Sequence, residues 1–231
     1  MAPLVGSGLW FGSSGNGRGI FALGNTTATN IYTYSSNGVT TGTSLTADSA
    51  WGSAAGNSTL GIFAPGNTTA TNIYTYSSNG VTTGTSLTAT LYAGAAAGNS
   101  TLGIFAFGNL ALATNVYTYS SNGVTTGTNL TGGLNGGAAA GNSTLGIFAL
   151  GGTATNIYTY SSNGAATGTS LAGSLGSGAA AGNSTLGIFA LGNTSTTTNI
   201  YTYSSNGVTT GTNLTAILYL GAAASSTPGG F

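Results

Sequence analysis

The amino-acid sequence predicts an all-β protein, a single five-bladed β-propeller with four-stranded antiparallel blades and repeats of about 42 residues. Three observations lead to this prediction. A motif that begins Gly-Ile-Phe-Ala occurs five times, and the Asn-Gly pairs that follow it lie 41 to 43 residues apart. Each repeat contains four short segments with the composition of β-strands. A fixed period of this length with four strands in each repeat is typical of a propeller blade.

The prediction treats residues 1–231 as one domain. It comprises an N-terminal strand segment at residues 1–16, five repeats at residues 17–220, and a C-terminal surplus strand and tail at residues 221–231. No stretch approaches the roughly 20 apolar residues of a membrane-spanning helix, so we expect no membrane span. The first residues also lack the basic and apolar regions of a conventional signal peptide.

The first strand of each repeat consists mainly of small residues, as in the run from Gly94 to Gly98. Small side chains suit a crowded position where other backbones approach closely. At the N-terminus, the segment at this position begins with Leu9, Trp10 and Phe11. We expect this segment to be the first strand of the first repeat.

The second strand, residues 19–23 in the first repeat, is apolar on both faces. We therefore expect it to be covered on both sides. The loop that follows is the one place where the repeats differ clearly in length, which indicates an exposed edge. These variable loops begin at Asn25, Asn67, Asn109, Gly152 and Asn193.

The third strand alternates, with Tyr32 and Tyr34 on one face, and it leads to Asn37 and Gly38. Asn-Gly between two strand-like segments predicts a hairpin with a type I′ turn, in which both central residues have positive φ. We expect the paired tyrosines of each repeat to pack between blades because a tyrosine buries a large apolar area. The alternative is a sugar-stacking platform repeated in every blade.

The order of these four segments resembles the kelch repeat. In that family the second strand ends in a Gly-Gly pair, the third carries an aromatic residue and the fourth carries a tryptophan. Here only Gly151 and Gly152 keep the Gly-Gly pair, and Val39 stands near the position of the kelch tryptophan. The resemblance covers nearly the whole chain and implies a propeller fold.

The composition excludes most chemistry. The chain has one basic residue, Arg18, one acidic residue, Asp48, and no His or Cys. General acid–base catalysis, protein-built metal sites and the neutralisation of nucleic-acid phosphates all need side chains that are missing. We therefore expect no enzyme activity, catalytic residue, cofactor, metal or nucleic-acid partner.

The sequence contains six small-residue strands for five blades. The C-terminal copy either closes the ring of its own chain or completes the first blade of the next copy, as in donor-strand complementation. A donated strand would make a head-to-tail polymer. The candidate assembly residues are Trp10, Phe11, Gly221, Ala222, Ala223, Ala224, Ser225 and Phe231.

Near-zero net charge and near-identical repeats favour a structural function. We expect a homopolymer, an extracellular or cell-surface fibre, tube or pilus. The composition and expected fold are similar to those of propeller subunits in tubular surface appendages of cyanobacteria. The alternative is a glycan- or receptor-binding module, such as a lectin, an adhesin or a phage tail protein, that uses the variable loops. Four Asn-Ser-Thr sequences, at Asn57, Asn99, Asn142 and Asn183, also match N-glycosylation sites.

Overall fold

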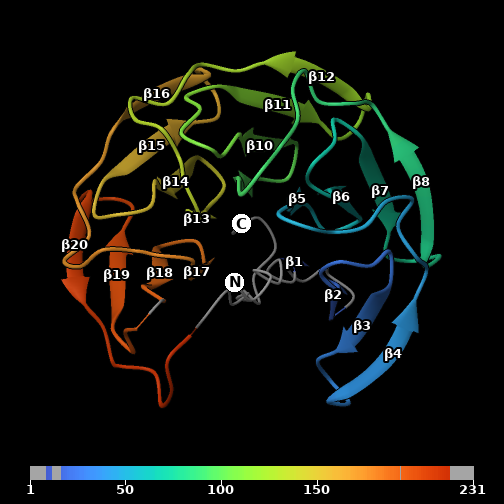
Figure 1. The fold of residues 1–231 in the computed structure, drawn as a ribbon, viewed down its shortest axis with the longest axis horizontal. Helices are drawn as coiled ribbons and strands as arrows, with labels where there is room; N and C mark the ends of the chain where they lie inside the picture. Colours follow the sequence, from blue (N-terminus) through green and yellow to red (C-terminus); the bar gives the residue numbers. More distant parts are fainter. Residues whose placement is uncertain (1–8, 12–16, 193, 219–231) are drawn as a thin grey trace, which may run out of the picture.

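The computed structural model describes residues 9–11, 17–192 and 194–218. These residues form five four-stranded antiparallel sheets, and each sheet keeps its strands in chain order. The five-bladed β-propeller of four-stranded blades is therefore confirmed (Figure 1). No helix of the described residues has the length and apolar character to cross a membrane.

Each blade is a simple meander of four strands. Blade 1 contains β1 (Leu9–Phe11), β2 (Arg18–Ala22), β3 (Thr29–Thr33) and β4 (Gly38–Gly42). Blade 2 contains β5 (Ser53–Gly56), β6 (Leu60–Ala64), β7 (Thr71–Thr75) and β8 (Gly80–Gly84). Blade 3 contains β9 (Ala95–Gly98), β10 (Leu102–Ala106), β11 (Thr114–Thr118) and β12 (Gly123–Thr126).

The last two blades repeat this pattern. Blade 4 contains β13 (Ala138–Gly141), β14 (Leu145–Ala149), β15 (Thr155–Thr159) and β16 (Gly164–Thr167). Blade 5 contains β17 (Ala179–Gly182), β18 (Leu186–Ala190), β19 (Thr198–Thr202) and β20 (Gly207–Thr210). In Figure 1 the blades follow one another around an arc, with β5, β13 and β17 towards the centre and the fourth strands along the perimeter.

The hairpin between the third and fourth strands is confirmed, but the predicted type I′ turn is wrong. Thr33 pairs with Gly38, so the loop has four residues, Tyr34 to Asn37. Asn37 has φ 52°, whereas Gly38 is not among the residues with positive φ. Asn is one of the few residues besides Gly that adopt a left-handed conformation readily, and Asn37 is the residue of this loop that has a positive φ.

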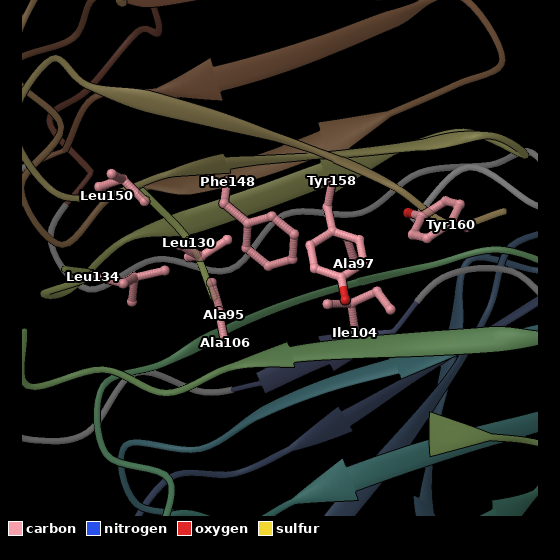
Figure 2. Packing of buried hydrophobic residues seen from close by; sticks show 10 residues of the cluster. All are labelled: Ala95, Ala97, Ile104, Ala106, Leu130, Leu134, Phe148, Leu150, Tyr158 and Tyr160. Atoms are coloured by element: carbon pink, nitrogen blue, oxygen red, sulfur yellow. The ribbon is translucent and has the colours of Figure 1, made fainter. Parts of the chain in front are cut away.

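The hydrophobic core lies between the blades. Ile104 and Leu130 of blade 3 meet Phe148 and Tyr158 of blade 4 in one cluster, shown in Figure 2. The rings of Phe148 and Tyr158, on adjacent strands, lie 6.4 Å apart with an interplanar angle of 66°. Equivalent clusters join blades 1 and 2, blades 2 and 3, and blades 4 and 5.

The second strand is covered on both sides in the middle of the arc, as predicted. In β14, Ile147 and Phe148 point to opposite faces and both are fully buried. Phe148 packs towards blade 3, whereas Ile147 packs towards blade 5. The two apolar faces of this strand therefore serve two different interblade contacts.

The N-terminal strand lies in its own first blade. β1 pairs with β2, with Trp10 opposite Phe21. In blades 2 to 5 the residue opposite the equivalent Phe is an alanine, such as Ala54 opposite Phe63. The first-strand position of blade 1 is therefore occupied by Leu9–Phe11.

Candidate assembly site: the blade joints and the two end faces

The contact between consecutive blades is the same structure repeated four times, and we call it the joint. Each joint combines the trailing face of one blade, which is turned towards the next blade, with the leading face of that next blade. The trailing face contributes an Ile of the second strand and a Leu that follows the fourth strand. The leading face contributes a Phe of the second strand and the two tyrosines around the end of the third strand.

A hydrogen-bonded clamp closes each joint at its outer side. In the joint between blades 3 and 4, the Thr128 backbone NH donates to the Tyr158 hydroxyl at 3.1 Å and to Asn163 Oδ1 at 3.2 Å. The Tyr158 hydroxyl in turn donates to Asn163 Oδ1. The Asn of the Asn-Gly motif therefore has a second function beyond the turn, because its Oδ1 accepts a hydrogen bond from a backbone NH of the preceding blade. The equivalent Thr and Asn pairs are Thr43 with Asn79, Thr85 with Asn122, and Thr169 with Asn206.

A second clamp uses the Asn of the third strand. Asn156 is 1% exposed; its Oδ1 accepts from the Thr131 backbone NH at 2.7 Å and its Nδ2 donates to Thr131 Oγ1 at 2.8 Å. A buried amide costs free energy unless its polar atoms are bonded, so this pair is specific as well as stabilising. The same Asn position accepts a backbone NH in every joint, at Asn72, Asn115 and Asn199 as well.

A glycine at the end of the fourth strand makes room for the tyrosine of the next blade. A Cβ at Gly127 would lie 2.3 Å from Thr114 Oγ1 and 2.5 Å from the Tyr158 hydroxyl. The same two neighbours crowd Gly42, Gly84 and Gly168. At Gly211, the equivalent residue of blade 5, the threonine is present and no tyrosine lies near.

The second tyrosine of each leading face is buried with an unsatisfied hydroxyl. The hydroxyls of Tyr76, Tyr119, Tyr160 and Tyr203 have no hydrogen-bond partner among the described residues. Burial raises the pKa of each of these four hydroxyls above its ordinary value because the phenolate would lose its hydration. The predicted packing of the paired tyrosines between blades is confirmed in blades 2 to 5.

Three of the four Asn-Ser-Thr sequences belong to the joints. The side-chain nitrogens of Asn57, Asn99 and Asn142 donate to the backbone oxygen of a serine in the next blade, at 3.1 to 3.2 Å. This is the nitrogen to which an N-glycan would be attached. Asn183 is exposed, and among the described residues its side-chain nitrogen has no such acceptor.

The trailing face of blade 5 is the half of a joint without its partner. Ile188 is 36% exposed, whereas Ile147 at the equivalent position of blade 4 is 0% exposed. Leu214 is 38% exposed, whereas Leu171 is 3% exposed. Nevertheless the backbone NH of Leu214 donates to the Thr196 oxygen at 2.8 Å, the same bond that Leu171 makes to Thr153. The segment therefore has the conformation of a joint while its side chains are accessible.

The leading face of blade 1 is the complementary half. Leu23 and Tyr34 are 38% and 36% exposed, and Val39 is 59% exposed. The Tyr32 hydroxyl already donates to Asn37 Oδ1, as in the other four blades. No described residue donates to Asn30, the equivalent of the buried Asn156. We call these two surfaces, the trailing face of blade 5 and the leading face of blade 1, the end faces.

The first residues of three variable loops are exposed, and backbone hydrogen bonds hold these loops to neighbouring segments. Asn25, Asn67 and Asn109 are exposed with positive φ, and Gly152 has φ 90°. The Gly152 NH donates to the Leu175 oxygen at 2.8 Å, which ties this loop to the linker between blades 4 and 5. Asn193 lies outside the described residues.

A depression is lined by residues that immediately precede the first strands of blades 2 to 5, including Trp51, Ala93 and Ser177. All three have positive φ. The Trp51 ring stacks on Tyr92, with centroids 5.3 Å apart and an interplanar angle of 22°. This depression forms only where four linkers far apart in the sequence converge in space, so no local sequence pattern marks it.

The predicted assembly residues fall into two groups. Trp10 and Phe11 are in β1, which pairs within its own blade. The others lie outside the described residues, namely Gly221, Ala222, Ala223, Ala224, Ser225 and Phe231. The end faces were not predicted. The sequence feature that could have indicated them is that blades 1 and 5 carry the same joint residues as the other blades.

No known protein family matches the sequence, and no curated protein matches it either. Among solved structures, a structural genomics protein of unknown function from Bacteroides thetaiotaomicron is similar, with a TM-score of 0.66 and 11% identity. The similarity covers 97% of this chain and 65% of that chain, so the present chain spans about two thirds of the length of this neighbour. At this identity the likeness concerns the fold alone.

Proposed function

We propose that the protein is a structural subunit that assembles head-to-tail with copies of itself into an extracellular fibre, tube or pilus. The observation that carries this proposal is the uncharged perimeter of the propeller. The fourth strands β4, β8, β12, β16 and β20 each pair on one side only and carry Gly, Val, Ala and Thr without a charged residue or proline. Soluble proteins usually protect such edges with Lys, Pro or bulges.

The absence of differentiation between blades supports the same function. The four joints use the same Thr-to-Asn clamp at their outer side, and at least one exposed threonine of the fourth strand recurs in each blade. A building block needs repeated surfaces, whereas a binding or catalytic propeller needs one surface that differs from the rest. A protein with one acidic and one basic residue also lacks the repulsion that keeps subunits apart.

Strand donation is the mechanism that we propose for the head-to-tail contact. Residues 221–225 of one copy would pair with β2 of the next copy in the position that β1 occupies in the isolated chain. The small side chains of this run match the alanines found opposite Phe63, Phe105, Phe148 and Phe189. The donated strand would displace β1 from β2. It would then form with β2 the same kind of antiparallel main-chain hydrogen bonds that β1 forms in the isolated chain.

Negative-stain microscopy and analytical ultracentrifugation of the purified chain test this function. We expect polymers for the full chain, and monomers with unchanged far-UV circular dichroism after deletion of residues 221–231. A full chain that sediments as a monomer at all concentrations contradicts the proposal. Polymers that persist after the deletion contradict strand donation.

A binding module is the second candidate, and one observation favours it. The stacked pair of Trp51 and Tyr92 lies beside the depression described above, and aromatic faces are suited to stacking against sugars. Binding of the monomer to a glycan array, lost in Trp51→Ala, would support this candidate. The matched control is Val39→Ala, an exposed residue of β4 that does not line the depression.

A further inference from the structure

Five equivalent joints would be needed to close a five-bladed ring, and the described residues form four. Hydrophobic clusters join blades 1 to 2, 2 to 3, 3 to 4 and 4 to 5. Among the described residues, none of these four clusters combines residues of blade 5 with residues of blade 1. Figure 1 shows the consequence, an arc with β20 of blade 5 at one end and β4 of blade 1 at the other.

The two end faces are halves of the same joint. Blade 5 presents Ile188 and Leu214, the residues that blade 4 inserts against blade 5 as Ile147 and Leu171. Blade 1 presents Leu23 and Tyr34, which correspond to buried residues such as Leu191 and Tyr203 of blade 5. The chain therefore shows, at its own internal joints, what covers each end face.

Both halves have the conformation that the joint requires. In blade 5, Thr198 Oγ1 donates to the Thr212 oxygen at 2.8 Å, as Thr155 does to Thr169 in blade 4. In blade 1, the Tyr32 hydroxyl holds Asn37 Oδ1, the acceptor for an incoming backbone NH. Surfaces that are ordered before binding lose less conformational entropy when they associate.

Closure of the ring within one chain would disturb the existing joints. The four joints share the same Asn clamp, and with these joints as they stand blades 1 and 5 lie at the two ends of the arc (Figure 1). To close the ring, the clamps at Asn72, Asn115, Asn156 and Asn199 would all have to change their geometry. Contact of an end face with a second copy requires no change in these four clamps.

We infer that the trailing face of blade 5 binds the leading face of blade 1 of a second copy of this chain, through a fifth joint. This inference rests on the proposed function, because it names the surfaces by which the subunits assemble. The Thr212 NH donates to Tyr32 and Asn37 of the next copy, the Thr215 NH donates to Asn30, and Ile188 and Leu214 pack against the leading face. The contact is heterologous, so it propagates head-to-tail.

Cysteine cross-linking tests the inference, because the chain has no native cysteine. The single variants Thr215→Cys and Asn30→Cys are mixed and treated with a short bis-maleimide. We expect covalent dimers from the mixture and a ladder of oligomers from the double variant. The matched control is Thr131→Cys with Asn156→Cys, where the native side chains lie 2.8 Å apart within one chain. This control should give only an internally cross-linked monomer.

Two outcomes overturn the inference. A double variant that yields only an internally cross-linked monomer shows ring closure within one chain. A double variant that gives no product, while the control pair reacts, shows that other residues cover the end faces. If microscopy shows filaments in either of these two cases, the proposed function stands and the subunits assemble through a different contact. A protein that is monomeric under all conditions contradicts both the proposed function and the inference.

Discussion

The rings of Tyr74 and Tyr76 lie 6.4 Å apart in the joint between blades 1 and 2, yet their hydroxyls have opposite environments. The Tyr74 hydroxyl donates to Asn79 Oδ1, whereas the Tyr76 hydroxyl is buried without a hydrogen-bond partner among the described residues. A Cβ at Gly61 would lie 2.9 Å from the Tyr76 hydroxyl, so the site is also closely packed. This pair therefore separates the packing contribution of a tyrosine from that of its hydroxyl.

Removal of the unpaired hydroxyl should stabilise the fold. Tyr76→Phe keeps the ring and relieves the desolvation of an unsatisfied group, so we expect the free energy of unfolding to rise by about 1 kcal/mol. Tyr74→Phe is the matched control and should lower it by about 1 kcal/mol, because a hydrogen bond is lost. Urea denaturation of both variants checks the prediction, and a loss of stability in Tyr76→Phe contradicts it.

Stability should fall at alkaline pH. The pKa of Tyr119 and of Tyr160 is raised well above the usual 10.0 by burial, so the folded state holds these protons more tightly than the unfolded state. The associated stability is fully present below about pH 10 and is lost as the pH rises towards the folded-state pKa values. Thermal melts between about pH 8 and about pH 12 should show this decline, because the phenol of an unfolded tyrosine titrates near pH 10.

A double variant supplies the control for the alkaline decline. Tyr119→Phe with Tyr160→Phe removes two of the buried phenols, so its stability should depend less steeply on pH above about pH 10. Absorbance at the wavelength of the phenolate should show fewer late-titrating groups in the double variant. An unchanged pH dependence would mean that these two hydroxyls do not govern alkaline unfolding.

The glycine at the end of the fourth strand should be intolerant of substitution. In Gly127→Ala the new Cβ would meet Thr114 Oγ1 at 2.3 Å and the Tyr158 hydroxyl at 2.5 Å, so the joint must open. We expect a loss of about 2 kcal/mol, within the range for overpacking a closely packed site. Gly123→Ala in the same blade has only the flexible Ser121 side chain near it and should be close to neutral. Equal effects in the two variants would contradict this account.

Equivalent leucines should respond differently to a charge. Leu171→Asp places a carboxylate in a core where the native side chain is 3% exposed, so we expect a loss of several kcal/mol, about 3 or more. Leu214→Asp changes a residue that is 38% exposed in the single chain, so the thermal midpoint of the monomer should hardly move while polymerisation is lost. Calorimetry and sedimentation of both variants check this, and strong destabilisation of the monomer by Leu214→Asp would contradict it.

Much of the fold could be predicted because its strands are specified locally. The apolar second strand and the paired tyrosines each carry their own periodicity, so their burial in the middle blades was expected. The turn at Asn37 was predicted incorrectly, because Asn-Gly is compatible with more than one hairpin and the strand register selects the four-residue loop. The segment that begins at Leu9 was expected to supply the first strand of blade 1, and Leu9–Phe11 pairs with β2; its register came only from the structure.

The sequence alone determined that five similar four-stranded units form and that the chain has one acidic and one basic residue. Period and composition act over a few residues, and they suffice for strands and hairpins. Only the tertiary structure decided that Asn156 reaches Thr131, 25 positions away, and that Ile188 and Leu214 remain exposed while their counterparts are buried. The reason is geometric: whether the last blade meets the first depends on the sum of the rotations at all joints, which no single repeat specifies.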